Sequence, residues 1–349
     1  MTFSWPDVLT GLVHGEDMDA GTTRWAMNEI LSGNTGTAQM AAFMTVLRAK
    51  GETVAEIDAL AAGMLDKATP IELPTDAVDV VGSGGDRANT VNISTMAAIV
   101  AAAAGAKVIK HGNRAASSMS GTADCLEALG VALNVPPARQ REVLDACGIV
   151  FLFAPLYHAS LRHTAPVRKE LGIQTTFNFL GPLANPARPA AQAIGVANSE
   201  LADLVAGVLA ARGNRGMVFH GEDGLDELTT TTSSDIWLIR EGQVVRSEFD
   251  PGELNIAPAR PADLVGGDPE HNAQVVRDVF AGETGPVRDI VLVNAAAALL
   301  AFDGPDLSVP VAGQLLAKAD QAAEAIDTGK ASALVDRWVE ATQRAVSQG

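Results

Sequence analysis

Apolar positions near the N-terminus recur at helical spacing. Four apolar stripes, each repeating every three to four residues, are separated by polar residues or glycine. This period places each stripe on one face of a helix. Thr53 precedes the fourth stripe and Glu56 follows three residues later, which is the capping-box pattern of a helix start. Pro70 and Pro74 then interrupt the pattern, so we expect residues 1–74 to form a small all-helical domain.

From residue 77 onward, short apolar runs alternate with longer amphipathic ones. The short runs have the length of buried strands, and the longer runs have the helical period. Strands that alternate with helices form a largely parallel sheet with helices on its faces. The predicted strands are Val78–Val81, Ala106–Ile109, Ile149–Phe153, Ala191–Val196, Gly216–His220, Ile236–Arg240 and Gln243–Arg246.

The helices predicted between these strands complete an α/β domain. They span 95–104, 121–130, 137–146, 199–212, 271–281 and 288–302, and two more fill 311–349 on either side of Gly329. A helical stretch rich in His and Arg, residues 158–185, interrupts the alternation. The expected fold class is therefore α/β, with a small helical domain and a large domain built on a mainly parallel central sheet.

The composition excludes several classes of function. No apolar run approaches the ~18 residues of a membrane helix, and the N-terminus lacks the basic and apolar regions of a signal peptide. Cys125 and Cys147 form no C-x-x-C motif and are expected to be buried thiols of a cytoplasmic protein. The net charge of −17 disfavours nucleic acid and anionic membranes as partners. An anionic ligand would need a local concentration of positive charge.

A glycine-rich loop, Gly82-Ser83-Gly84-Gly85-Asp86, ends the first predicted strand and leads into a helix. Glycine lets the backbone approach an anion closely, and a helix N-terminus offers unpaired N–H groups. The loop is neither a dinucleotide fingerprint, because Arg87 stands at the sixth position, nor a P-loop, because Asp86 follows Gly85. A phosphate-bearing ligand is the first hypothesis, and a simple tight turn is the alternative.

A basic cluster, Lys110-His111-Gly112-Asn113-Arg114, follows the second strand. In open α/β sheets, ligands bind beyond the carboxyl ends of the strands. Lys110 and Arg114 can pair with phosphate oxygens, and the hydroxyls of Ser117 and Ser118 can donate hydrogen bonds. A solvated basic loop would show the same pattern.

A second basic cluster lies in the helical interruption. Pro166 suits the first turn of a helix and places Arg168 near its start. Arginine can bind a carboxylate through two hydrogen bonds. An exposed helix face is the alternative.

An acidic cluster that includes Asp223, Asp226 and Glu227 follows the fifth predicted strand. Adjacent carboxylates without nearby His or Cys suit a hard, water-retaining ion such as Mg²⁺, although a solvated acidic turn would look similar. The glycine, basic and acidic loops each follow a strand, so they can converge on one rim of the sheet. Together they predict a site for a diphosphate with Mg²⁺.

Several motifs in order resemble the anthranilate phosphoribosyltransferase family over nearly the whole chain. They are the glycine loop, Val91-Asn92-Ile93-Ser94-Thr95, Lys110-His111-Gly112-Asn113-Arg114, Val167-Arg168-Lys169-Glu170-Leu171-Gly172, Gly181-Pro182-Leu183 and Asp223-Gly224-Leu225-Asp226-Glu227. The chain departs from the family pattern at Ser83, Gln174, Ala184 and Thr232-Ser233-Ser234. None of these departures removes a residue expected to take part in the chemistry.

The resemblance implies an enzyme of tryptophan biosynthesis that joins anthranilate to phosphoribosyl pyrophosphate (PRPP), with Mg²⁺ as cofactor. It also implies that helices near 170–190 join the small domain and that 75–169 and 191–349 form the large one. The site would lie in the cleft between the two domains, and a homodimer would form through the helical domain.

The resemblance further implies a set of site residues. For PRPP these are Gly82, Gly84, Gly85, Asp86, Thr90, Asn92, Ser94, Thr95, Lys110, Asn113, Ser117, Ser118 and Ser120. For anthranilate they are Gly82, His111, Asn113, His158, Arg168 and Gly181. The metal would be held by Ser94, Asp226 and Glu227, and His111 and Arg168 are the expected catalytic residues.

Three other functions remain open at this point. A pyrimidine nucleoside phosphorylase would share the two-domain plan, but its Lys-His-Ser-Thr-Gly-Gly and Ser-Gly-Arg-Gly-Leu-Gly strings are absent. A catalytically silent relative that binds nucleic acid would need an extended basic face. A phosphoribosyltransferase of the same fold could use a different acceptor amine, and only Arg168 and its neighbours argue against it.

Overall fold

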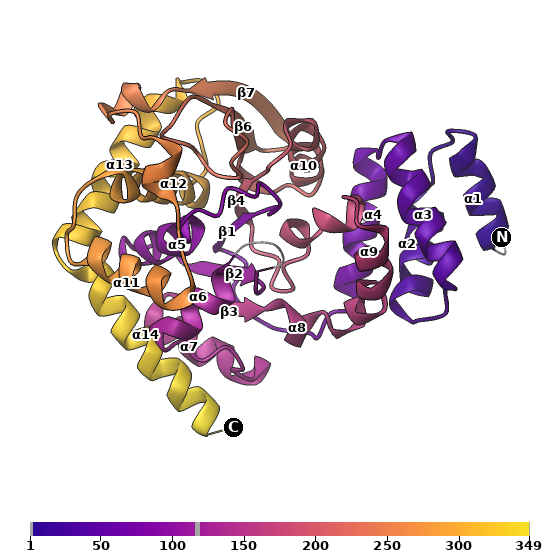
Figure 1. Ribbon diagram of the computed structural model, residues 1–349, viewed down its shortest axis with the longest axis horizontal. Coiled ribbons are helices and arrows are strands. Elements are labelled where there is room, and N and C mark those ends of the chain that lie inside the picture. The colour runs from indigo at the N-terminus through magenta and orange to yellow at the C-terminus, as the bar shows by residue number, and fades with distance from the viewer. Residues whose placement is uncertain (1–2, 116–118, 349) are drawn as a thin grey trace. The chain divides into compact units, whose positions relative to one another are not determined.

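The computed structural model describes residues 3–115 and 119–348. The chain folds into two units, one made of Met1–Pro70 and Ala154–Pro186 and the other of Ile71–Phe153 and Ala187–Gly349 (Figure 1). The second segment of the helical unit thus begins at Ala154, earlier than the expected 170. The reason is local, because β3 ends at Phe153 and helical turns start at the next residue. No helix among the described residues is both long and apolar enough to span a membrane.

The helical unit contains the four N-terminal helices that the apolar stripes predict. They are α1 (Trp5–Val13), α2 (Ala20–Leu31), α3 (Thr37–Lys50) and α4 (Val54–Asp66). The predicted capping box is present, because Thr53 Oγ1 accepts from the Glu56 N–H at 3.2 Å and the Glu56 carboxylate accepts from the Thr53 N–H at 2.9 Å. The second segment adds short helices and turns: α8 (Ala154–Tyr157), η2 (Ala159–His163), α9 (Ala165–Leu171), η3 (Thr176–Asn178) and η4 (Gly181–Leu183).

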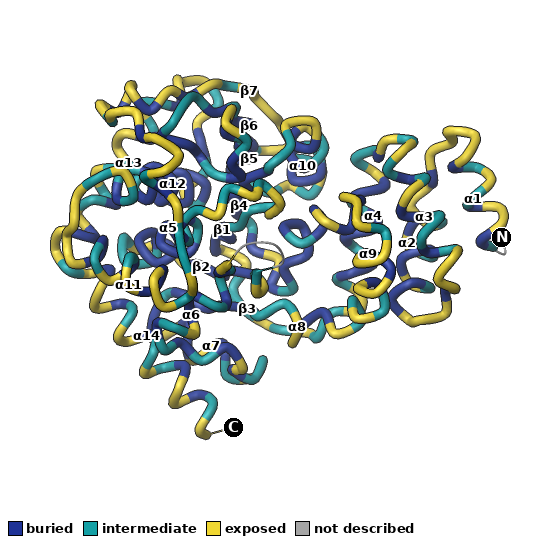
Figure 2. Tube along the Cα trace, in the orientation of Figure 1, coloured by how far each residue is buried: buried dark blue, intermediate teal, exposed yellow. Residues whose placement is uncertain are grey.

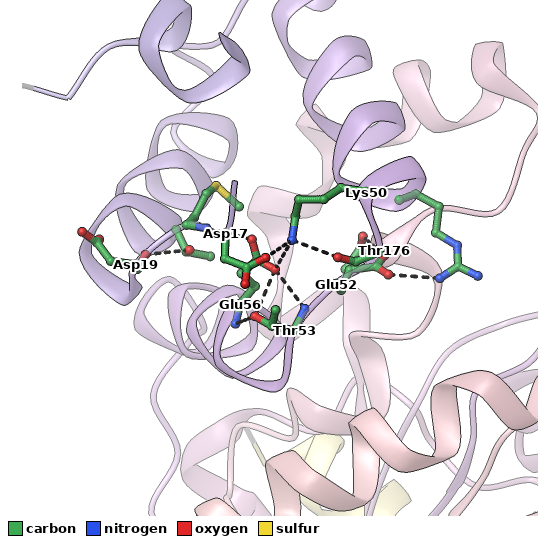
Figure 3. A network of polar contacts seen from close by, with 11 residues as sticks. Asp17, Asp19, Lys50, Glu52, Thr53, Glu56 and Thr176 are labelled. Carbon is green, nitrogen blue, oxygen red and sulfur yellow. Dashed lines mark hydrogen bonds and ion pairs between the residues drawn. The ribbon is translucent and has the colours of Figure 1, made fainter. Parts of the chain in front are cut away.

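A network of charges joins the second segment to the N-terminal helices (Figure 3). Glu52, just beyond α3, accepts hydrogen bonds from Arg48 at 3.0 Å and from the Thr176 hydroxyl at 2.5 Å. Lys50 donates to the buried Glu56 at 2.9 Å and to Asp17 at 2.6 Å. Burial alone would lower the pKa of Lys50, but its hydrogen bonds to the two carboxylates outweigh burial and raise it. Removing Lys50 would leave Glu56 as a buried charge without its ion-pair partner, which destabilises the fold.

The α/β unit is built on a seven-stranded sheet with the order β3-β2-β1-β4-β5-β6-β7. The first five strands are parallel, and β6 and β7 extend the edge in antiparallel pairs. The strands are β1 (Val78–Gly82), β2 (Val108–Gly112), β3 (Ile149–Phe153), β4 (Ala191–Gly195), β5 (Arg215–Gly221), β6 (Ser234–Arg240) and β7 (Gln243–Phe249). The mainly parallel sheet and all seven predicted strands are confirmed.

Register aligns the carboxyl ends of the parallel strands. Gly82 pairs with Gly195, Gly195 with Phe219, and Gly112 with Phe153. The loops that leave these strands therefore start at one rim of the sheet, which is where ligands bind in open α/β folds.

The predicted helices of this unit are also present, with small changes at their ends. They are α5 (Ile93–Ala103), α6 (Thr122–Leu129), α7 (Gln140–Cys147), α10 (Ser199–Ala211), α11 (Pro269–Phe280), α12 (Pro286–Asp303), α13 (Val311–Asp327) and α14 (Lys330–Ser347). Helices α5 and α12 pack against each other and against the central strands. Both are buried along most of their length (Figure 2). Their alanine-rich sequences follow from this, because small side chains allow close packing on every face.

Candidate active site

A cavity of about 310 Å³ opens at the rim of the sheet in the α/β unit. Its walls come from the glycine loop after β1, the basic loop after β2, the start of α5 and the acidic loop after β5. All three of the strand-end loops that the sequence marks in this unit therefore contribute to one cavity. The predicted convergence of the glycine, basic and acidic loops on one rim is present in the structure.

Asp226 links the acidic loop to the glycine loop. Its Oδ2 accepts a hydrogen bond from the Gly84 N–H at 2.6 Å. A Cβ on Gly82 would lie 2.2 Å from this carboxylate oxygen, and one on Gly195 would lie 1.7 Å from the Asp226 carbonyl oxygen. Glycine is required at both strand ends because Asp226 occupies that space. The sequence explained the glycines only by the approach of an anion.

The acidic loop is held rigidly on both sides of its two carboxylates. Asp223 accepts hydrogen bonds from the hydroxyls of Thr229, at 2.7 Å, and Thr231. The buried side chain of Asn294, on α12, accepts from the Leu228 N–H at 3.0 Å and donates to the Leu228 carbonyl at 2.8 Å. Rigid support of this kind keeps functional groups in place before a ligand arrives.

The two neighbouring carboxyl groups of the acidic loop have raised pKa values. Desolvation and the nearby Asp86 raise the pKa of Asp226 to about 7. Desolvation and then Asp226 raise the pKa of Glu227 well above its ordinary value, and the Ser94 N–H at the start of α5 acts in the opposite direction. Carboxylates this close together and this poorly solvated bind a proton or a cation favourably.

Lys110 is a buried residue of β2 that lines the same cavity as the two carboxylates. Its ammonium group donates to the Val80 carbonyl and, at 3.3 Å, to the Ser94 hydroxyl. Desolvation lowers the pKa of Lys110, opposed by the charges of Asp79, Glu227 and Asp226. The lysine therefore fixes the floor of the cavity near the first turn of α5.

Two residues have side-chain partners that the sequence did not predict. Thr95 was expected to cradle phosphate, but its hydroxyl donates to Thr122 at 3.4 Å, and Thr95 is absent from the described lining. Arg114 lines the cavity, where it was expected to pair with phosphate, and its guanidinium group there pairs with Asp124 at 2.7 Å and Glu127 at 2.9 Å. These neighbours, one turn apart on α6, could not be placed next to Arg114 from the sequence.

Arg87 is a cation that the sequence analysis did not assign. It lines the cavity from within the glycine loop, where its backbone is left-handed with φ of 60°. Such a conformation in a residue other than glycine is uncommon and is often found at functional sites. The sequence contains Arg87 within the glycine loop but does not predict its left-handed backbone conformation.

The remaining expected residues fall into three groups. Those that line the cavity are Gly82, Gly84, Gly85, Asp86, Thr90, Asn92, Ser94, Lys110, His111, Asn113, Ser120, Asp226 and Glu227. Ser117 and Ser118 lie outside the described residues. His158, Arg168 and Gly181 belong to the helical unit.

Within the helical unit, Arg168 has a buried guanidinium nitrogen that lacks a hydrogen-bond acceptor among the described residues. Pro166 does stand in the first turn of α9, and Arg168 follows two residues later. Its Nε is buried and has no hydrogen-bond partner among the described residues. Burial lowers the pKa of Arg168. A buried, unpaired guanidinium nitrogen calls for an anionic group to complete it.

His158 supports the turn that contains Gly181. Its Nε2 lies 2.8 Å from the Ala184 carbonyl oxygen. A carbonyl can only accept, so this ring nitrogen carries the proton. Burial lowers the pKa of His158 despite this bond, which keeps the ring neutral near pH 7.

Comparison with known proteins agrees with this architecture. The sequence matches a glycosyl transferase family α/β domain over residues 74–332 and a glycosyl transferase family helical bundle domain over residues 6–68. An anthranilate phosphoribosyltransferase of Acidothermus cellulolyticus is 55% identical over 344 residues, covering 99% of this chain and 97% of that protein.

Two solved structures share the fold. Anthranilate phosphoribosyltransferase from Thermus thermophilus has a TM-score of 0.89 at 38% identity, over 97% of this chain and 99% of that chain. The Saccharomyces cerevisiae protein in complex with PRPP and Mg has a TM-score of 0.87 at 25% identity, over 97% and 98% of the two chains. Both the sequence and the fold of this chain are therefore similar to those of anthranilate phosphoribosyltransferases, in agreement with a cavity suited to a phosphate-bearing ligand.

Proposed function

The chain belongs to the anthranilate phosphoribosyltransferase family, and on this premise we propose how its residues perform that reaction. The enzyme transfers the 5-phosphoribosyl group of PRPP to the amine of anthranilate. The products are N-(5-phosphoribosyl)anthranilate and pyrophosphate, in tryptophan biosynthesis. The observation that carries this function is the single cavity that joins a glycine loop, a helix N-terminus and Lys110 to a pair of carboxylates with raised pKa values.

The reaction explains why the site contains these groups. Breaking the anomeric C–O bond leaves positive charge on the ribose and negative charge on the departing pyrophosphate. Catalysis therefore depends on holding the reactants in place and stabilising the leaving group, and no covalent nucleophile is needed. The Ser94 side chain and the first turn of α5 line the cavity where they can donate to phosphate oxygens, and Lys110 donates to the Ser94 hydroxyl at 3.3 Å.

Mg²⁺ fits the donors of the acidic loop. Asp226 and Glu227 supply oxygen ligands, and Ser94 adds a hydroxyl in the same cavity. Among the described residues, no three His, Cys, Asp or Glu side chains are placed to hold a metal ion by themselves. This agrees with an ion that keeps several waters and takes further oxygens from its substrate. When bound, Mg²⁺ neutralises charge on the pyrophosphate.

We assign the acceptor amine to the residues that the family resemblance marks for anthranilate. Arg168 binds the anthranilate carboxylate, which would give its buried Nε a hydrogen-bond acceptor. The other residues assigned to anthranilate are His158, Gly181, Gly82, His111 and Asn113. Because an aryl amine is neutral at pH 7, no strong base is needed before attack. His111 receives the amine proton late in the reaction.

The alternative functions are less well supported. A nucleoside phosphorylase has no use for the two carboxylates of the acidic loop, and a nucleic-acid-binding relative is disfavoured by the charge of −17. An acceptor amine that lacks a carboxylate would leave the buried Nε of Arg168 without an acceptor.

We also propose a homodimer formed through the helical unit and located in the cytoplasm. Val13 and Ile173 of that unit are 68% and 52% exposed, so they offer apolar surface to a second copy. Both cysteines are free and buried, as a reducing compartment allows. Light scattering of the purified chain should give twice the mass of one chain, and a monomer would contradict the dimer.

Purified enzyme should consume anthranilate only when PRPP and Mg²⁺ are both present. The reaction removes the fluorescent free amine, so a fluorimeter follows it directly. Loss of fluorescence without PRPP, or transfer to another aryl amine in preference to anthranilate, would contradict the proposed reaction.

Replacing Arg168 by alanine should weaken anthranilate binding selectively. Charge-assisted hydrogen bonds contribute about 1.5–3 kcal/mol, so the anthranilate KM of Arg168→Ala should rise roughly ten- to hundredfold while the PRPP KM changes little. The neighbouring Lys169→Ala is the matched control and should behave as wild type. An unchanged anthranilate KM with a raised PRPP KM would disprove this role.

Neutralising the acidic pair should remove the response to Mg²⁺. The double variant Asp226→Asn with Glu227→Gln keeps the size of both side chains but lacks their charge, so saturation should need at least roughly tenfold more Mg²⁺ and kcat should fall. The exposed Glu222→Gln in the same loop serves as control. Full activity at the wild-type Mg²⁺ requirement would rule out these ligands.

A further inference from the structure

Asn272 is a buried asparagine that none of the sequence motifs includes. It lies in the first turns of α11 and is 2% exposed. Its Oδ1 accepts from the Gly267 N–H at 2.7 Å, and its Nδ2 donates to Asn92 Oδ1 at 2.8 Å, across 180 residues of sequence. Because an N–H can only donate, the Gly267 bond fixes which end of the Asn272 amide is oxygen. The nitrogen end must therefore face Asn92.

Asn92 stands at the N-cap of α5, the helix whose first turn lines the cavity. An asparagine there normally accepts from the second or third N–H of its own helix. Asn92 makes no such capping bond. Its Oδ1 instead accepts from Asn272 and, at 3.3 Å, from the Ser120 hydroxyl, and its Nδ2 donates to the Ser120 carbonyl at 3.2 Å.

A short strap, residues 264–267, holds Asn272 against the same loop. The Val91 N–H donates to the Leu264 carbonyl at 2.9 Å, and the Gly266 N–H donates to the Asn89 carbonyl at 2.8 Å. A Cβ on Gly266 would lie 2.8 Å from the Thr90 carbonyl oxygen and 2.9 Å from Asn272 Oδ1. The strap and Asn272 are therefore in close contact with residues 89–91, which precede α5.

We propose that Asn272 is a positioning residue that prevents Asn92 from capping its own helix. An Asn92 side chain released from Asn272 would compete for the N–H groups at the start of α5. One of these groups, the Ser94 N–H, interacts with Glu227, and a phosphate oxygen of PRPP would use those that remain. Because its hydrogen bond directs the Asn92 side chain away from the helix N–H groups, Asn272 keeps the helix N-terminus accessible to the substrate. This inference rests on the proposed function, because it takes PRPP as the ligand of this cavity.

The substitution Asn272→Asp tests this role. It preserves size and the acceptor for the Gly267 N–H but removes the donor to Asn92. The PRPP KM should rise roughly tenfold, the penalty of an unmet buried hydrogen bond, while the anthranilate KM stays within about twofold. Asn272→Ala, which adds no charge, should shift the PRPP KM in the same direction. Gln274→Glu, an exposed amide-to-acid change on the same helix, is the control and should match wild type.

A double-mutant cycle separates positioning from general support of the fold. If Asn272 acts by keeping the Asn92 side chain away from the helix N–H groups, Asn92→Ala removes the competing side chain, and adding Asn272→Asp to Asn92→Ala should change the PRPP KM no further. If Asn272 only stabilises the fold, the two effects should multiply. Multiplying effects, or a wild-type PRPP KM in both Asn272 variants, would overturn the proposal.

Calorimetry with pyrophosphate and Mg²⁺ provides a second readout that does not need turnover. The affinity for pyrophosphate should fall roughly tenfold in Asn272→Asp. Wild-type enzyme that binds pyrophosphate but transfers no phosphoribosyl group would refute the proposed function and leave this inference standing. Equal pyrophosphate affinity in wild type and variant would refute the inference alone.

Discussion

Negative charge buried at the rim of the sheet is the constraint on which the rest of the site depends. Asp226 and Glu227 face each other's charge and that of Asp86 in a poorly solvated cavity, and Lys110 below them compensates only part of it. Such an arrangement costs stability unless something positive completes it. In the proposed reaction a bound Mg²⁺ would supply that positive charge, and the diphosphate that it accompanies is the leaving group. The carboxyl groups of Asp226 and Glu227, which destabilise the free protein, would thus be the groups that bind the metal ion.

The surrounding fold is organised to maintain that constraint. Parallel strands end level at one rim, and glycines at two of those ends leave room for Asp226. Buried amides from the later helices hold the loops: Asn294 clamps the backbone after the carboxylates, and Asn272 holds the start of α5. Residues from the C-terminal part of the chain therefore set the geometry of motifs found much earlier in the sequence.

Much of this could be predicted from sequence, and the exceptions have a physical pattern. The strands and helices follow from hydrophobic period, and the cavity-lining loops follow from the rule that ligands bind at strand ends. The side-chain partners of Thr95 and Arg114 could not be predicted, because Thr122 and the acidic residues of α6 are tertiary neighbours. Asn272 and Asn294 lacked any motif, because a buried amide that satisfies backbone or side-chain groups looks like any other asparagine in sequence. How the helical unit contributes Arg168 to the reaction remains a prediction.

The central claim is that the two carboxylates of the acidic loop and the first turn of α5 hold one magnesium-bound diphosphate. The most direct measurement is a crystal structure of the wild-type chain soaked with PRPP and Mn²⁺, in which anomalous scattering locates the ion. The account predicts an ion beside Asp226 and Glu227, with the diphosphate between it and the start of α5. An ion and diphosphate bound elsewhere, with both carboxylates empty, would contradict it.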